Sequence, residues 1–404
     1  MRRRDLGFGR AFTLLLAAAG LAACVAEPGA PGYVRPSVAG PAPIPSPAGR
    51  RVAILLPLTG PAAETGQALL RAAQISLDRP GAPPLDAKDT GGTPVGAAEA
   101  ARQALADGAG LILGPLTAGE TAAVAPIAKG AGVAVLAFTS DIAQAQPGVW
   151  TLGITPAQQV RRLVLAVQGE GKQRITAVLP MNAYGDAMAA GLGAATSAAG
   201  LGEARVVRYA PGFSGINAAL KDASDYDKRH GAADAAKQTD ADKPTLPSPP
   251  MDALLLGTAG DQLGQAIPLL AFYDIGPGQV RIMGPALWAR DTSRLSAVPG
   301  AWYAAPDPAL RGAFEQRYTA KYNTPPRELA SLAYDAAGIA AVAAAGPGFR
   351  PDALARPAGY AGADGLIVLH PDGSVRRGLA IFEVDRAGAH IVQPSPQTPS
   401  APGV

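Results

Sequence analysis

The chain has 404 residues, 48% hydrophobic and 17% charged, so it can bury one large core or two moderate ones. Its formal net charge is only +3, and its basic residues are scattered beyond the N-terminus, which argues against nucleic acid as a partner. Aromatic residues make up 5%, too few to predict a platform on which bases or sugars stack.

Residues 1–24 have the features of a bacterial lipoprotein signal peptide. Four arginines precede an apolar run, 11–23, that is too short to span a bilayer comfortably. The run ends in Leu21-Ala22-Ala23-Cys24, a lipobox, so we expect Cys24 to carry the lipid. The alternative is an ordinary signal peptide with an incidental cysteine. Val25 stands where an aspartate would signal inner-membrane retention, which favours a periplasmic protein anchored to the outer membrane.

Residues 25–50 are rich in Pro, Ala, Gly and Ser and lack the apolar residues that a core needs. We expect a disordered, semi-extended tether here. Residues 392–404 have a similar composition and predict a disordered tail.

Residues 51–141 alternate strands with helices. Short apolar runs at 52–56, 111–113 and 133–138 predict buried strands, and a brief strand is expected near 85–88. The segments 64–78 and 95–106 have helical patterns. Thr117 and Glu120 have the spacing of a capping box at the start of another helix. This alternation predicts a parallel sheet with ligands at the carboxyl ends of its strands.

The second half of the chain continues the alternation. Strands are predicted at 174–179, 204–209, 252–256, 280–283 and 301–305, and helices at 156–168, 184–198, 261–272, 308–322 and 327–345. Residues 224–250 are polar and charged and predict a mobile insertion. Residues 365–369 and 378–384 flank a Pro-Asp-Gly turn and predict a late hairpin.

No catalytic or cofactor motif stands out. The chain lacks a GxGxxG that leads from a strand into a helix, and it lacks a P-loop. His230, His370 and His390 are far apart, and the one cysteine belongs to the lipobox. The sequence therefore predicts no metal site, no cofactor and no enzyme.

Three segments carry a family resemblance: ILLPLTGPAAETGQALLRAAQISLD, GAGLILGPLTAGETAAVAPIAKGAGVAVLAFTSD and VLPMNAYGDAM. The chain resembles the type I periplasmic binding proteins, in the branch that binds leucine, isoleucine and valine. With the later GLIVLHPDGSVRRGLAIFEV, the pattern looks closest to the lipoproteins called penicillin-binding protein activators.

The resemblance implies an α/β fold of two lobes, each a mostly parallel sheet flanked by helices, joined by a hinge. It divides the domain 51–391 into a first lobe of about 51–152 and 303–345 and a second lobe of about 153–302 and 346–391. The late hairpin would then belong to the second lobe.

The candidate ligand-binding residues lie at predicted strand ends and helix starts. Hydroxyls from Thr59, Thr117, Thr139 and Ser140, with backbone N–H groups at helix starts, would suit a carboxylate. The resemblance implies this role for Thr117, Thr139 and Ser140, although Thr117 has the alternative role of a helix N-cap.

The resemblance also implies that Tyr184 faces the cleft, whereas the alternative places it in the core. In the family's amino-acid binders, a second-lobe carboxylate holds the ligand's ammonium group. Here Gln262 aligns with that position, with Asp261 beside it. An ammonium group left without a counter-charge in a closed cleft is unfavourable, so Asp261 would have to replace the carboxylate.

Two functions compete. In the first, the protein regulates a peptidoglycan synthase, a penicillin-binding protein, by surface contact. In the second, it is the receptor of an ABC importer for branched-chain amino acids or a related small polar ligand.

Overall fold

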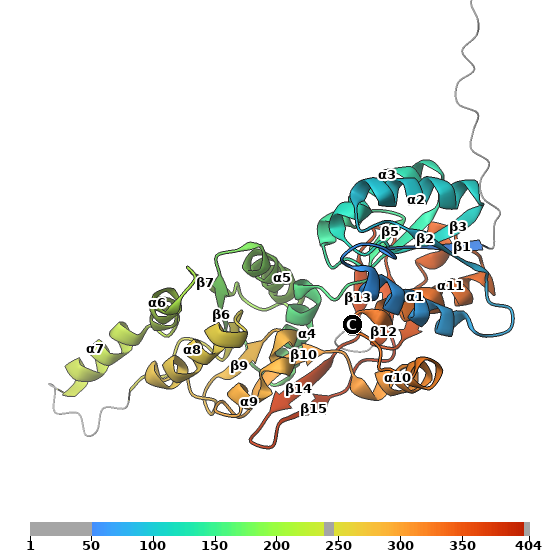
Figure 1. Cartoon of the computed structure of the whole chain (residues 1–404). Coiled ribbons are helices and arrows are strands. Elements are labelled where there is room, and N and C mark those ends of the chain that lie inside the picture. Colours follow the sequence, from blue (N-terminus) through green and yellow to red (C-terminus); the bar gives the residue numbers. More distant parts are fainter. Residues whose placement is uncertain (1–50, 238–245, 400–404) are drawn as a thin grey trace, which may run out of the picture. The chain divides into compact units, whose positions relative to one another are not determined.

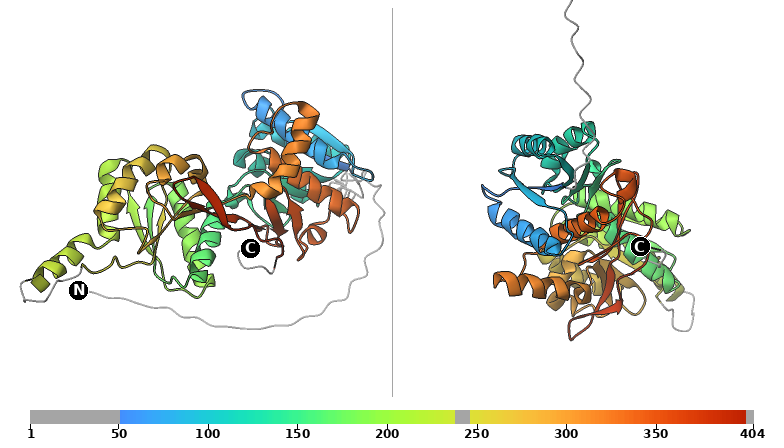
Figure 2. Two further views of the ribbon diagram at one scale, coloured as in Figure 1. Left: turned by 90° about the horizontal axis from the view of Figure 1, so that it is seen from below. Right: turned by 90° about the vertical axis from the view of Figure 1, so that its right-hand side faces the viewer.

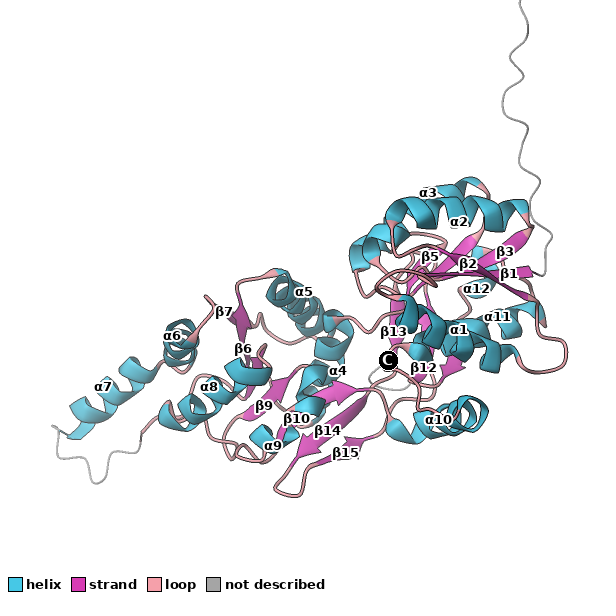
Figure 3. Cartoon of the chain, viewed as in Figure 1, coloured by secondary structure: helices cyan, strands magenta, loops and turns pink. Residues whose placement is uncertain are grey.

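The computed structural model describes residues 51–237 and 246–399, which fold into two sheets flanked by helices and a third, smaller sheet (Figures 1 and 3). The α/β fold class predicted from the sequence is confirmed. The predicted signal peptide, Cys24 and the tether lie outside the described residues.

The first sheet is parallel and has the strand order β2-β1-β3-β4-β5. Alternate residues of β1 enter two cores: Val52 and Ile54 pack beneath α1 and α11, and Ala53 and Leu55 pack beneath α2 and α3. Burial on both faces explains why the strand is an apolar run. The elements are β1 (Arg51–Leu56), β2 (Leu85–Asp89), β3 (Ala109–Leu113), β4 (Ala134–Ala137), β5 (Val149–Thr151), α1 (Ala63–Leu77), α2 (Pro94–Ala106), α3 (Ala118–Gly130) and α11 (Ala330–Ala344).

The second sheet has the order β15-β14-β10-β9-β8-β6-β7, in which β14 and β15 are antiparallel additions to a parallel sheet. Its strands are β6 (Ile175–Pro180), β7 (Arg205–Tyr209), β8 (Ala253–Leu256), β9 (Arg281–Gly284), β10 (Ala301–Ala305), β14 (Ala380–Val384) and β15 (Ala389–Gln393). One core forms with α4 (Pro156–Gly169) and α5 (Ala183–Ala198). The other forms with α6 (Phe213–Ala223) and α8 (Gly260–Phe272), next to η2 (Ala286–Arg290) and α9 (Thr292–Leu295).

The third sheet joins β11 (Tyr360–Gly362), β12 (Gly365–Leu369) and β13 (Val375–Arg377) and follows α12 (Pro351–Leu354). Ile367 and Leu369 belong to the core beneath α11, as does Phe314 of α10 (Pro308–Tyr322). We call the first and third sheets with their helices the first lobe, and the second sheet with its helices the second lobe.

The chain passes between the lobes three times, after β5, after β10 and after β13. Arg377 joins two of these crossings, because its Nε donates to the Leu152 carbonyl at 3.0 Å. At the remaining crossing, Asp307 Oδ2 accepts from the Ser395 backbone N–H at 3.3 Å, so the C-terminal segment returns to the same region.

Four expectations need correction. The predicted late hairpin is wrong, because β12 pairs with β13, whereas β14 pairs with β10 and β15 in another sheet (Figure 2). The segment 365–369 therefore lies in the first lobe, and β10 lies in the second lobe. The tail does not begin at 392, since Gln393 ends β15 and Ser395 is buried. Part of the polar insertion forms α7 (Tyr226–Lys237).

Candidate functional site

A cavity of 920 Å³ lies at the carboxyl ends of β4 and β10, where both lobes and two chain crossings meet. Its size is within the range of small-molecule sites. Its lining comes from the first lobe, the crossings and the second lobe. It includes Phe138, Thr139, Ser140, Gly153, Gln159, Ala286, Tyr303, Arg311, Glu315, Ser331, Asp364 and Phe382.

Thr139 and Ser140 form part of the first-lobe wall of the cavity. The Thr139 hydroxyl accepts from the Asp141 backbone N–H at 3.0 Å, which turns the chain directly after β4. A Cβ on Gly153 would lie 2.6 Å from the Ser140 backbone nitrogen, so only glycine allows the first crossing to pass this close. Ser140 remains exposed at the cavity.

The second-lobe wall is apolar. Tyr303 of β10 stacks on Phe382 of β14 with ring centroids 4.9 Å apart, and burial raises the pKa of the Tyr303 hydroxyl to about 12. The Gln159 amide oxygen already accepts from the Ala286 backbone N–H at 2.8 Å. This wall therefore offers hydrogen bonds to a ligand but no charge.

The charged groups at the cavity come from the first lobe and face one another. Arg311 of α10 lies 3.5 Å from the Asp364 carboxylate and 3.3 Å from Glu315. Ser331 of α11 donates to the other Asp364 oxygen at 2.5 Å. Asp364 Oδ1 is buried and accepts no hydrogen bond from the described residues, and Arg311 is the cation that faces it.

Thr59 and Thr117 do not line the cavity, although both follow strands as predicted. The Thr59 hydroxyl donates to Asp89 at 2.7 Å, and Asp89 also accepts from the Leu58, Thr59 and Gly91 backbone N–H groups. Thr117 and Glu120 form the capping box predicted from their spacing, which is confirmed. Both hydroxyls therefore hold local structure.

The second-lobe candidates also lie outside the lining. Tyr184 is partly buried and packs against the core of α4 and α5, and burial raises its pKa to about 12. Asp261 is 94% exposed and pairs with Arg294 at 3.1 Å. Gln262 accepts from the Tyr209 hydroxyl at 3.3 Å. The structure thus brings Thr139 and Ser140 together without these three residues.

Sequence reasoning missed Arg311, Asp364 and Ser331. Arg311 lies in an amphipathic helix and Asp364 in a tight turn, so nothing in the local pattern separated them from surface residues. Their proximity depends on how α10 and α11 pack beside the third sheet, which is a long-range contact.

The described part of the chain holds neither a candidate metal cluster nor a candidate membrane-spanning helix. Across 51–237 and 246–399, no group of three or more His, Cys, Asp or Glu side chains could hold a metal ion. Within the same ranges, no helix combines the length and hydropathy needed to cross a membrane.

A protein of two α/β lobes, crossed three times by the chain and holding a cavity between them, has the architecture of a bilobal binding protein. The comparisons agree with this class. The family model described as periplasmic binding protein matches residues 50–389, and the chain belongs to this family.

Solved structures support the same fold. A putative branched-chain amino acid ABC transporter from Rhodospirillum rubrum matches with a TM-score of 0.64 at 21% identity, over 85% of this chain and 99% of that one. Full-length LpoA from Haemophilus influenzae matches with a TM-score of 0.62 at 16% identity, over 85% of this chain and 59% of that one.

The C-domain of the same LpoA, described as a regulator of PBP1A, matches with a TM-score of 0.61 at 16% identity, over 85% of this chain and 99% of that one. A comparison with curated proteins finds no match. The relatives found are thus binding proteins or regulators of periplasmic type. At these low identities, the structural likeness establishes the fold alone.

Proposed function

We propose that this chain is a non-enzymatic, lipid-anchored periplasmic protein that regulates a peptidoglycan synthase, a penicillin-binding protein, by direct contact. The observation that carries the proposal is the second-lobe wall of the cavity, which presents Tyr303, Phe382 and Ala286 and no charged side chain. A zwitterionic amino acid needs opposite charges at its two ends when it is taken out of water.

The charges that do reach the cavity support the same proposal. Arg311, Glu315, Glu328 and Asp364 all belong to the first lobe, where Arg311 pairs with Glu315 and with Asp364. A ligand held by them would gain no charged contact with the second lobe. Capture of an amino acid would then provide little free energy for drawing the lobes together.

The anchor is part of the proposal. Lipid on Cys24 would hold the folded body on the inner surface of the outer membrane, and residues 25–50 would let it reach a synthase in the periplasm. Replacing Cys24 with serine should abolish labelling by radioactive fatty acid and release the protein into the soluble periplasmic fraction.

The test combines two measurements on the purified full chain in detergent. Thermal unfolding is followed with each proteinogenic amino acid in excess, and glycan polymerisation by purified penicillin-binding proteins is followed with and without the chain. We expect an unchanged midpoint for every amino acid and a faster rate with one synthase. A ligand at a hundred times its Kd would stabilise by about 2.7 kcal/mol, so a midpoint rise with leucine, isoleucine or valine would contradict the proposal.

The second candidate function is a receptor for a small amino-acid-like ligand, with Thr139 and Ser140 as its carboxylate site. It is favoured by the exposed Ser140 hydroxyl at the end of β4 and by the presence of the Asp364 carboxylate in the lining of the same cavity. Under this candidate, Ser140→Ala would remove the midpoint shift given by the ligand. Under the regulator proposal, Ser140→Ala leaves stimulation of the synthase unchanged.

A further inference from the structure

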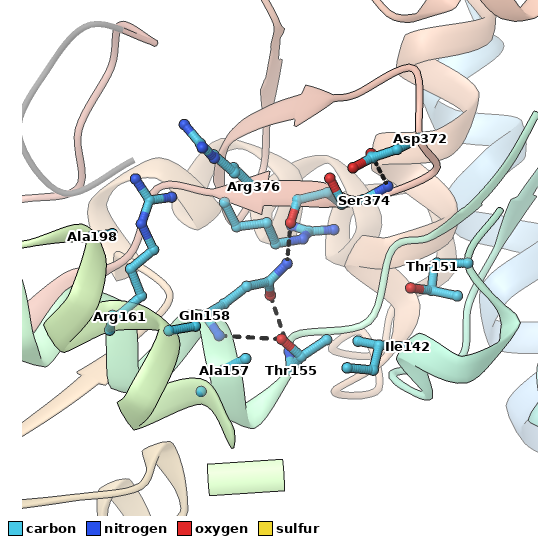
Figure 4. Close-up of a pocket in the computed structure, with 16 residues that line it drawn as sticks. Ile142, Thr151, Thr155, Ala157, Gln158, Arg161, Ala198, Asp372, Ser374 and Arg376 are labelled. Carbon is cyan, nitrogen blue, oxygen red and sulfur yellow. Dashed lines mark hydrogen bonds between the residues drawn. The ribbon is translucent and has the colours of Figure 1, made fainter. Parts of the chain in front are cut away.

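A second cavity, of 560 Å³, lies apart from the one described above (Figure 4). Helices α4 and α5 of the second lobe form one side of it. The turn from β12 into β13 and the short helix η1 (Ile142–Gln144) of the first lobe form the other. No predicted ligand-binding residue lines it.

Two arginines in this cavity have no counter-ion. Arg161 of α4 is half-buried and Arg376 of β13 is exposed, and neither side chain makes an ion pair or hydrogen bond with any residue in the described ranges. Their sequence neighbours differ: Arg162 donates to the Leu379 carbonyl at 2.7 Å, and Arg377 pairs with Asp335 at 3.3 Å. Arg162 and Arg377 therefore have structural roles, whereas the side chains of Arg161 and Arg376 have no such partner in the described part of the chain.

The two guanidinium groups are close enough to repel each other. Burial, and after it the charge of Arg376, lowers the pKa of Arg161. Burial lowers the pKa of His370 as well, and both arginines add to that effect. In Figure 4 the two guanidinium groups lie on the same side of Gln158. Like charges held together without a partner destabilise a fold, which points to a ligand that supplies the missing charge.

The Asp372 carboxylate, which also lines the cavity, does not supply the negative charge that the two arginines lack. Asp372 accepts from the Ser374 backbone N–H at 2.8 Å, which closes the turn between β12 and β13, and it forms no ion pair with Arg161 or Arg376. Arg377 also lines the cavity, but its side chain is wholly buried and pairs with Asp335. The cavity thus has an excess of cationic donors.

The wall beside the arginines is made of small apolar residues of α5. Ala194 and Ala198 are exposed there, and Gly191 lets α5 approach α4 so closely that a Cβ on it would lie 2.7 Å from the Ala157 Cα. The N-terminus of α4 is not free to bind an anion, because Thr155 and Gln158 close it with a capping box. Affinity for an anion would therefore come from the arginine side chains, and affinity for an apolar group from α5.

We infer that this cavity binds a small organic oxyanion, with its carboxylate or phosphate on Arg161 and Arg376 and its apolar part on α5. Guanidinium groups suit both oxyanions, since they offer paired N–H donors in a plane. The inference does not depend on the proposed function, because it concerns different residues and a different ligand.

The test is calorimetric titration of the full chain in detergent at low salt with hexanoate, hexyl phosphate and hexanol. We expect binding of at least one anion, weaker binding at high salt, and no binding of hexanol. The stronger of the two anions identifies the oxyanion. Equal binding of hexanol, or binding of neither anion, would overturn the inference.

Substitution of the two arginines tests whether the anion binds in this cavity. Arg161→Gln and Arg376→Gln should each weaken anion binding by about tenfold. Arg102→Gln, which alters an exposed arginine paired with Glu99 in the first lobe, is the matched control and should bind as the native chain does. Undiminished binding in both cavity variants would place the anion elsewhere.

Stability without ligand separates a binding role from a structural one. Because each cavity variant removes a like-charge repulsion, neither should lower the midpoint of thermal unfolding. A lower midpoint in both variants would show that the arginines hold the fold, and would contradict the inference.

Discussion

Asp335 and Arg377 form an ion pair that is wholly buried where the lobes join. Asp335 also accepts from the Ala363 backbone N–H at 2.6 Å, and Arg377 donates to the Leu152 carbonyl. Burial raises the pKa of the Asp335 carboxyl to about 7, although Arg377 acts in the opposite direction. The pair thus ties α11 to two chain crossings through contacts between buried charged groups.

Arg377→Met should destabilise the protein by about 3 kcal/mol at pH 8, because it leaves the Asp335 carboxylate buried without a counter-charge. Loss of Arg377 also raises the Asp335 pKa further, so the difference from the native chain should grow as the pH rises above about 7. Urea unfolding at several pH values measures both effects. Arg350→Met, at an exposed pair with Asp352, should change stability by less than about 1 kcal/mol.

The lowered pKa of Asp252 predicts that the stability of the fold depends on pH in the acid range. The hydrogen bond of Asp252 with Arg174 is the largest cause that lowers its pKa, to about 2. A lowered pKa stabilises the fold above the unfolded value of 3.8, and this stabilisation is lost as the pH falls toward 2. Asp252→Asn should therefore cost about 1–2 kcal/mol at pH 6, where solvent partly screens the pair.

The same variant should lose less stability than the native chain between pH 6 and pH 2.5, as measured by urea unfolding. Asp352→Asn, at an exposed pair, is the control and should follow the native curve. Parallel curves for Asp252→Asn and the native chain would contradict this assignment of the pKa.

At the scale of elements, local patterns predicted most strands and helices. The run at 52–56 is confirmed as β1 and the segment 95–106 as α2, because burial and helical periodicity are properties of neighbouring residues. The late hairpin failed for a different reason. The Pro-Asp-Gly turn does reverse the chain, but into the three-residue strand β13, whose partner choice depends on the first-lobe core.

Of the seven candidate ligand-binding residues, only the two at the end of β4 line the cavity. Thr139 and Ser140 line the cavity because they directly follow β4, and the carboxyl ends of parallel strands share an edge. Whether a hydroxyl at such an end is free depends on a distant partner, as Asp89 shows for Thr59. The second-lobe wall depends on β10 and β14, which meet only in the folded protein.

The capping box of α3 makes a prediction of its own. Thr117→Ala removes the hydroxyl that accepts from the Glu120 backbone N–H, and it should reduce the unfolding free energy by about 1 kcal/mol. Ser197→Ala, at an exposed position near the end of α5, should have a smaller effect. If Thr117 instead bound a ligand, its substitution would change binding with little change in stability.

For the whole molecule, the three crossings and the Asp335–Arg377 pair predict one cooperative unfolding transition. The three tryptophans allow a test, because Trp150 reports on the first lobe and Trp288 and Trp302 report on the second. The variant Trp288→Phe/Trp302→Phe and the variant Trp150→Phe should each give a fluorescence midpoint that coincides with loss of helical circular dichroism. A fluorescence midpoint that precedes the loss of helix in one variant would show that the lobes unfold separately.

The position of α11 in the sequence has a consequence for how the protein is made. This helix is buried over most of its surface and covers Val52, Ile54 and Leu56, yet it follows the whole of β6 to β10 in the chain. While the chain is being synthesised and secreted from its N-terminus, α1 alone covers part of this face of the first sheet, and the rest stays uncovered until α11 emerges. A nascent chain at this stage exposes a hydrophobic surface that invites aggregation, so we expect the protein to need a holding chaperone during export.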